Sequence, residues 1–390
     1  MKWKFYSLAF VAGMSILTAC SSDDNNDNDG NGGNGNGNEI ENGTILKGTI
    51  TSDVTLAAGN TYKLSGEYIV EEGATLHIEE GVKIIAVYDD IADYILVKQG
   101  GKINAVGTPD KPIVMTSEKE EPGAWGGIHI CGRAHTNAEG GKGSSEIGGA
   151  VYGGNDDADN SGTLQYIRLE YTGFAFDEEH EANGISFYGV GNGTIVDHCQ
   201  AYKGSDDGFE FFGGSVNVSN LVAVSCSDDS FDWTEGWNGK GTNLVAYQEA
   251  ESTLGYDCDC LMECDNNGSN NAATPVAHPV LKNLILVGNG GSKQGIRLRA
   301  GTEVEIDNAK VCGKGQPLTV ETALTENALK NGTSKLTNIT LTSELSSKEG
   351  IYTHADFIAV TSNKVNANLS YSSFEDIRKE CSWMNGSWVK

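Results

Sequence analysis

The segment SDDGFE at residues 205–210 returns as SDDSFD at residues 227–232, an offset of 22 residues. At the same offset, Val196 matches Val218 and Ala201 matches Ala223. A fixed period of this size is typical of stacked structural units, because each unit covers the apolar side of its neighbour. The repeat therefore predicts a solenoid in which one coil contains 22 residues here and slightly more where turns are longer.

Short β-rich runs extend the pattern toward both ends of the chain. Residues 62–64, 75–78 and 94–97 are rich in β-branched and aromatic residues, and glycines such as Gly100-Gly101 separate the runs. Alternating apolar residues indicate strands with one buried face. Hairpin signals such as Asn-Gly are scarce, which favours parallel coils over hairpins. We therefore expect an all-β fold, a single-stranded right-handed parallel β-helix, over residues 45–390.

Aligning the coils on the repeat predicts which side chains point inward, since side chains alternate along a strand. One interior column contains Ile185, Phe209, Phe231, Tyr256 and Ile296. A second interior column contains Phe187, Phe211, Trp233, Cys258 and Leu298. The residues between them form an outward ladder of Ser186, Glu210, Asp232, Asp257 and Arg297. Since neighbouring rungs lie about 4.8 Å apart, the ladder places several carboxylates on one face.

The first residues predict an exported lipoprotein. Lys2 and Lys4 precede a short apolar run that ends in Leu17-Thr18-Ala19-Cys20, which resembles a bacterial lipobox. We expect a signal peptide at residues 1–19, acylation of Cys20, and a disordered Asn/Asp/Gly tether to residue 44. The SSDD sequence after Cys20 resembles the export signal of Bacteroidota surface lipoproteins, so we expect a lipid-anchored protein on the outer face of the outer membrane. An ordinary signal peptide and a generic acidic linker are the alternatives.

Charge and cysteine content narrow the possible partners. The chain has 54 acidic and 27 basic residues, a net charge of −27, which repels nucleic acid and favours cations or neutral glycans. Eight cysteines besides Cys20 permit disulfides in an oxidising compartment. Cys258, Cys260 and Cys264 form the densest group, for which a local disulfide is favoured over a metal site.

Several motifs together resemble a family of secreted right-handed β-helix proteins common in Bacteroidota. They include GGKINAVGT at 100–108, WGGI at 125–128, YGGND at 152–156, TEGWNGKG at 234–241 and IRLRAGT at 296–302, with the two Asp-Asp segments. The resemblance covers residues 66–311. It implies the β-helix fold and no particular activity.

The two Asp-Asp segments are the candidate metal site. Carboxylates on successive rungs repel one another and raise their own pKa values unless a cation offsets the charge. Calcium is the natural candidate because it takes several carboxylate and carbonyl oxygens. We expect the ligands to be Asp206, Asp207, Asp228 and Asp229. In the alternative interpretation, the first Asp of each pair holds a chain corner by hydrogen bonding to backbone amides.

Three functions are compatible with this face. The preferred one is non-catalytic binding of a glycan or a host ligand, with candidate contacts Glu210, Phe212, Asp232, Glu235, Trp237, Asp257 and Arg297. We expect Phe212 and Trp237 to be exposed, and Phe211 and Trp233 to be interior. The second is a glycoside hydrolase or polysaccharide lyase that uses Asp207, Glu210, Asp229, Asp232 and Arg297. The third is a purely structural surface protein. Cys381, Trp383 and Trp388 are expected to cap the open end of the solenoid.

Overall fold

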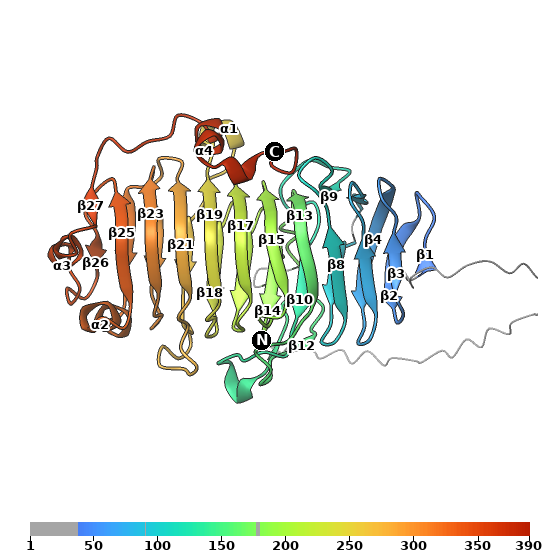
Figure 1. Cartoon of the computed structure of the whole chain (residues 1–390), viewed down its shortest axis with the longest axis horizontal. Helices are drawn as coiled ribbons and strands as arrows, with labels where there is room; N and C mark the ends of the chain where they lie inside the picture. Colours follow the sequence, from blue (N-terminus) through green and yellow to red (C-terminus); the bar gives the residue numbers. More distant parts are fainter. Residues whose placement is uncertain (1–37, 90, 177–179) are drawn as a thin grey trace, which may run out of the picture. The chain divides into compact units, whose positions relative to one another are not determined.

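The strands stack as successive rungs along one axis in a computed structural model that describes residues 38–89, 91–176 and 180–390 (Figure 1). The predicted signal peptide and Cys20 lie outside the described residues. The predicted tether boundary at residue 44 is too late, because strand β1 (Asn38–Glu39) already pairs with β3 (Val54–Leu56). Across the described ranges, no helix combines the length and the apolar character that a membrane crossing requires.

Parallel pairing arranges the strands in three columns, which confirms the predicted parallel β-helix. The first column starts with β1 and β3 and continues through β5 (Thr75–Ile78) and β8 (Lys102–Val106). The second contains β6 (Lys83–Ala86) and β9 (Ile113–Ser117). The third contains β7 (Tyr94–Val97), β10 (Ile128–Cys131), β14 (Ile185–Tyr188), β16 (Phe209–Phe212), β18 (Phe231–Thr234), β20 (Met262–Cys264), β22 (Gln294–Leu298), β24 (Gln316–Val320) and β26 (Ser346–Ser347). β2 (Ile45–Ile50) and β4 (Thr61–Val70) each span the second and third columns.

From β13 onward the first two columns merge into long bent strands. These are β13 (Gly162–Glu170), β15 (Ile195–Tyr202), β17 (Asn217–Val224), β19 (Lys240–Tyr247), β21 (Val280–Val287), β23 (Glu305–Cys312) and β25 (Lys335–Leu341), followed by the short β27 (Lys364–Val365). Each long strand bends at one residue with positive φ, and from β17 to β25 that residue is an asparagine. Asparagine tolerates this left-handed conformation better than most residues, so it is suited to a repeated bend.

The interior columns are stacks of aromatic and aliphatic side chains. Phe209 pairs in register with Phe231 and stacks on it with ring centroids 5.6 Å apart, and Phe187 stacks on Phe211 at 5.0 Å. Phe211 and Trp233 are buried, as predicted. Such stacks bury large apolar areas and add specific ring contacts, so they stabilise each coil against its neighbour.

One coil breaks the predicted register. In the structure Met262, Glu263 and Cys264 align with Ile296, Arg297 and Leu298, where the sequence alignment had placed Tyr256, Asp257 and Cys258. The prediction is wrong because the turn after β19 carries an insertion that includes helix α1 (Glu251–Leu254). Asp257 therefore lies in this longer turn, and Glu263 takes its place on the outward ladder.

The predicted local disulfide is also wrong. Among the described residues all eight cysteines are free thiols, and each is buried. Cys264 points into the main core, whereas Cys260 lies in the turn before β20 and its Sγ lies 3.4 Å from a carboxylate oxygen of Asp259. The neighbouring cysteines thus occupy different environments, because one belongs to a strand and the other to a turn.

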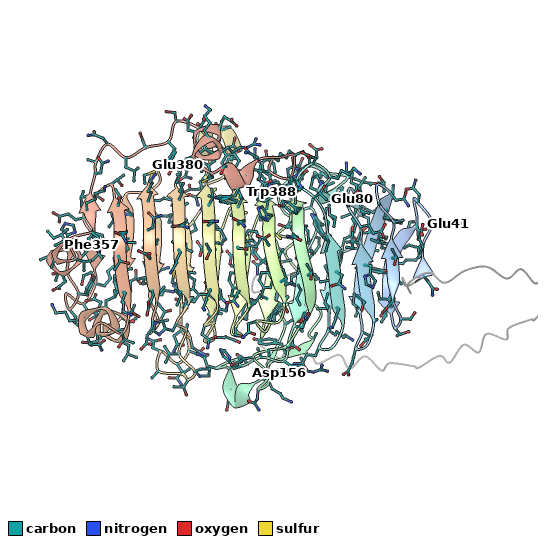
Figure 2. All side chains as sticks on the ribbon, in the orientation of Figure 1. Glu41, Glu80, Asp156, Phe357, Glu380 and Trp388 are labelled. Atoms are coloured by element: carbon teal, nitrogen blue, oxygen red, sulfur yellow. The ribbon has the colours of Figure 1, made fainter. Side chains whose placement is uncertain are left out.

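The C-terminal residues do not cap the open end of the solenoid. Residues 366–390, here called the C-terminal strap, include α4 (Phe374–Glu380) and return along the side of the coils (Figure 2). Trp388 and Ile377 are buried against the outer face of the long strands, and the Ser387 amide donates to the Pro109 carbonyl at 2.8 Å. The final coils are covered instead by α2 (Ala323–Asn331) and α3 (His354–Ala359), which contribute Leu329 and Phe357 to the core.

Candidate functional site

The outward face of the third column carries a hollow lined almost entirely by carboxylates. Its volume is about 220 Å³. We call it the acidic hollow, and its lining residues are Glu146, Glu181, Asn183, Asp206, Asp207, Glu210, Asp228, Asp229, Asp232 and Glu263. The two Asp-Asp turns precede β16 and β18, while Glu210, Asp232 and Glu263 come from the strands themselves. The structure therefore brings all four predicted metal ligands into one site.

The second Asp of each pair holds the chain corner. An oxygen of Asp207 accepts a hydrogen bond from the Asp229 amide at 2.8 Å, and an oxygen of Asp229 accepts one from the Cys260 amide at 2.6 Å. In the preceding coil, the side-chain oxygen of Asn183 accepts a hydrogen bond from the Asp207 amide at 3.2 Å. The alternative interpretation gives this role to the first Asp of each pair and is wrong in that respect, because the carboxylate of the second Asp reaches the next rung.

Replacing Asp207 by leucine is expected to lower the free energy of unfolding by about 1–3 kcal/mol, because the buried Asp229 amide loses its acceptor. Asp207→Asn is the matched control, since its amide oxygen can still accept the bond. Urea unfolding of both variants measures the difference. Equal midpoints for the leucine and asparagine variants would show that the corner bond contributes nothing.

The carboxylates of the hollow lie close enough together to share a cation. Oxygen atoms of Asp206, Asp207 and Asp228 lie within 4.8 Å of one another, as do oxygens of Asp207, Glu210 and Asp232. Oxygens bound 2.3–2.6 Å from a common calcium ion lie at most about 5 Å apart. One buried oxygen of Asp232 has no hydrogen-bond partner. These spacings and the unpaired oxygen fit a bound cation.

Burial and mutual repulsion shift the acids of the hollow in one direction. Burial, then the charge of Asp228, raises the pKa of Asp206 to about 8. Burial also raises the pKa of Glu146 to about 7. The pKa values of Asp207, Glu210, Asp229 and Asp232 are raised well above the usual range, first by burial and then by neighbouring carboxylates. Without a cation, these groups retain protons because charging them together is costly.

Arginines end the hollow on its C-terminal side. Arg297 pairs with Glu263 at 2.9 Å and with Glu321 at 3.3 Å, and Arg299 pairs with Asp265 at 2.7 Å. Arg297 thus lies on the outward ladder as predicted, but its guanidinium is committed to two carboxylates. The uncompensated negative charge of the hollow therefore lies on the N-terminal side of these arginines.

Three predicted ligand contacts are misplaced. Phe212 is buried and stacks on Tyr188 at 4.4 Å, and Trp237 is 1% exposed and stacks on Phe211 at 4.1 Å. The predicted exposure of both aromatic side chains is wrong, because each fills an apolar cluster. Asp257 is exposed in the α1 turn, where it accepts a hydrogen bond from Asn289.

Glu235 also points to other partners. It follows the C-terminal end of β18, and one of its oxygens accepts hydrogen bonds from Thr136 and Tyr152, both at 2.7 Å. These partners come from the excursion between β10 and β13 that includes the hairpin β11 (Gly143–Ser144) and β12 (Val151–Tyr152). Glu235 therefore fastens this excursion to the coils and does not line the hollow.

The prediction missed several contributors to the hollow. Glu146 and Glu181 come from excursions outside the 22-residue repeat, so no local pattern linked them to the Asp-Asp turns. Glu263 could have been found from its position immediately before Cys264, since MEC at 262–264 matches the apolar-charged-apolar order of FDW at 231–233.

The comparison with protein families agrees with this architecture. A family described as "Pectate-lyase like beta helix domain" matches residues 48–389. The chain belongs to this β-helix family. Among solved structures, the chain is similar to the Dettilon tailspike protein, with 8% sequence identity and a TM-score of 0.29. That alignment covers 76% of this chain and 56% of the tailspike chain, so the chain spans little more than half of the tailspike's length. Comparison with curated proteins gives no match.

Proposed function

We propose that this β-helix protein is a non-catalytic binding lipoprotein of the cell surface, anchored through Cys20, whose acidic hollow holds calcium. The observation that supports a calcium site is the set of side chains that line the hollow. Nine carboxylates line it, and within the described part of the chain no lysine or arginine does. A divalent cation would offset that charge, satisfy the unpaired Asp232 oxygen and return the acids toward their ionised forms.

The bound ion also gives the site a binding function. Asp228 lies at the open side of the cluster, since it is exposed while Asp206 and Asp207 are buried. A calcium ion held there keeps coordination positions toward solvent, which hydroxyl or carboxylate oxygens of a glycan can fill. The pectate-lyase-like family is consistent with a carbohydrate ligand.

Calcium binding is tested by calorimetric titration of the purified protein and by its melting midpoint with and without chelator. Saturation at 100 times the dissociation constant is expected to stabilise the fold by about 2.7 kcal/mol. Asp228→Asn is expected to weaken binding at least tenfold, because it removes a charged ligand. The control Asp257→Asn changes an exposed acid outside the hollow and should bind normally. No titration heat together with an unchanged midpoint would contradict the proposal.

A glycosidase remains the second candidate because of one observation. Oxygens of Asp207, Glu210 and Asp232 lie within 4.8 Å of one another, near the carboxyl separation of about 5 Å in retaining enzymes, and raised pKa values suit a general acid. Against it, the hollow has almost no apolar lining and no aromatic side chain for a sugar ring. Release of reducing ends from a polysaccharide panel, abolished by Glu210→Gln, would favour the enzyme.

A further inference from the structure

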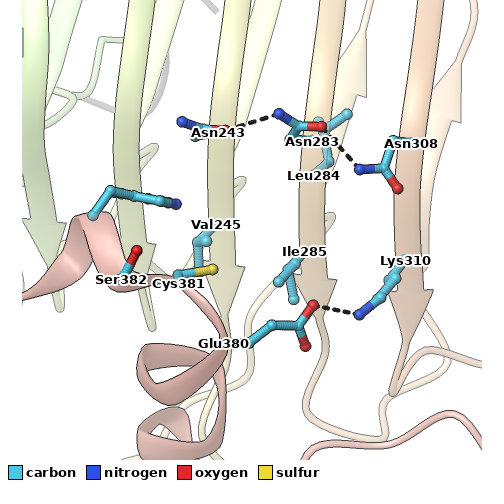
Figure 3. Close-up of a pocket in the computed structure, with 11 residues that line it drawn as sticks. Asn243, Val245, Asn283, Leu284, Ile285, Asn308, Lys310, Glu380, Cys381 and Ser382 are labelled. Atoms are coloured by element: carbon cyan, nitrogen blue, oxygen red, sulfur yellow. Dashed lines mark hydrogen bonds and ion pairs between the residues drawn. The ribbon is translucent and has the colours of Figure 1, made fainter.

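A second concave site lies where the C-terminal strap crosses the long strands (Figure 3). Its volume is about 290 Å³, and we call it the strap pocket. Asn243, Asn283 and Asn308 lie on adjacent strands along one side, and strap residues 380–383 form the facing side. The pocket is close to the lower limit of about 300 Å³ for small-molecule sites, so it suits one sugar ring rather than a long chain.

The asparagines form a hydrogen-bonded ladder with unused capacity. The Asn283 amide donates to Asn243 at 3.0 Å, and the Asn308 amide donates to Asn283 at 2.8 Å. A side-chain amide has two donor hydrogens and two acceptor lone pairs, so each ladder member keeps groups for a ligand. Asn283 and Asn308 are exposed. Adjacent rungs lie about 4.8 Å apart, a spacing that hydroxyls on one pyranose ring can span.

The pocket also has apolar and aromatic lining residues. Val245 and Ile285 form part of the lining beside the ladder, and the half-buried Trp383 closes it from the strap. The Trp383 ring is held edge-on to His198 with centroids 6.4 Å apart and lies 6.2 Å from Trp388. An indole fixed in this way offers a rigid apolar surface for the C–H groups of a sugar at low entropic cost.

The charges of the strap pocket are already paired. Lys310 forms an ion pair with Glu380, and the Tyr371 hydroxyl donates to the same carboxylate at 2.8 Å. The pocket thus presents no uncompensated charge, and the net charge of −27 repels anionic ligands at longer range. The pocket therefore selects a neutral polyhydroxyl ligand, because it offers side-chain amides, an indole and the Lys310–Glu380 ion pair.

We propose that the strap pocket binds one pyranose ring of a neutral saccharide, with its hydroxyls on the Asn283 and Asn308 amides and its apolar face on Trp383. This site shares the ligand class of the proposed function but uses none of the residues of the acidic hollow. It therefore does not depend on calcium. Contacts with the coils hold the strap in place before any ligand binds. Arg168 donates to the Ser387 carbonyl at 2.7 Å, and Lys390 pairs with Glu170 at 3.1 Å.

The test is calorimetric or NMR titration of the full-length protein with cellobiose, maltose, lactose and diacetylchitobiose, with digalacturonate as an anionic comparison. At least one neutral disaccharide is expected to bind, equally well with and without chelator. Asn308→Gly is expected to weaken that binding about tenfold, because it removes hydrogen bonds to the ligand. Glycine is chosen because it keeps the positive φ of this bend without strain.

Asn338→Gly is the matched control, since Asn338 occupies the same bend one coil further and does not line the pocket. Trp383→Ala should weaken binding to a similar extent while the melting midpoint reports any loss of folding. The proposal is overturned if no neutral disaccharide binds, if the two glycine variants lose affinity equally, or if digalacturonate binds most tightly. Because chelator leaves this site intact, its failure and the failure of the calcium site are distinguishable.

Discussion

Replacing Trp237 by alanine is expected to lower the free energy of unfolding by about 3–5 kcal/mol, the range for truncating a large buried aromatic. Trp237 is 1% exposed, stacks on Phe211 and donates through its indole N–H to the Val216 carbonyl at 3.2 Å. The substitution removes both the stack and this bond, and it leaves a cavity between coils. Urea unfolding followed by circular dichroism measures the loss.

Tyr88→Ala is the control for this substitution, since Tyr88 is an aromatic residue with 54% of its surface exposed. Its loss should change stability by less than about 0.5 kcal/mol. If Trp237→Ala instead unfolds like the wild-type protein and loses saccharide binding, the result contradicts a structural role for Trp237 and favours the ligand contact that the sequence suggested.

The metal-free protein is expected to lose stability through its acidic hollow as the pH rises from 5 to 8. The folded-state pKa of Asp206 is about 8 and that of Glu146 about 7, both above the unfolded values near 4. The folded state therefore binds more protons than the unfolded state in this window, so stability falls with rising pH. Each pKa unit corresponds to about 1.4 kcal/mol, which makes a loss of several kcal/mol expected for the cluster.

Other titratable groups also change the stability with pH, so the effect of the hollow has to be measured as a difference between a variant and the wild type. Buried His129, whose pKa is lowered to about 4, acts in the opposite direction because only the unfolded imidazole takes a proton near pH 6. The measurement is therefore the difference in melting midpoint between Asp206→Asn and wild type at each pH. The variant should be more stable at pH 8 and nearly equal at pH 5, and saturating calcium should reverse its advantage. A difference independent of pH would contradict the raised pKa of Asp206.

Much of the architecture was predictable from local patterns. The 22-residue repeat and the alternation within each strand predicted that Phe209 stacks on Phe231, and the structure has this pairing. The same alternation placed Glu210 and Asp232 side by side on the outward face. The asparagine ladder also has a sequence signal, since Asn-Leu recurs at 220–221, 243–244 and 283–284.

The predictions that were wrong share one physical cause. Side-chain alternation defines inward and outward positions only while successive coils have the same length, and the insertion with α1 moved Glu263 to the position expected for Asp257. Trp237 lies just beyond the end of β18, where alternation no longer specifies a direction and packing against Phe211 decides it. The role of each Asp in a pair depended on which carboxylate reaches the next rung, a distance set by the stacked backbone.

The sequence by itself determined the coil period, the interior columns of the regular coils and the concentration of acidic side chains on one face, because these depend on strand geometry repeated along the chain. Only the tertiary structure decided that Glu146 and Glu181 join the acidic hollow and that the C-terminal strap returns to Pro109. These contacts join segments far apart in the chain. They are selected by shape and burial in the assembled solenoid, which no local pattern encodes.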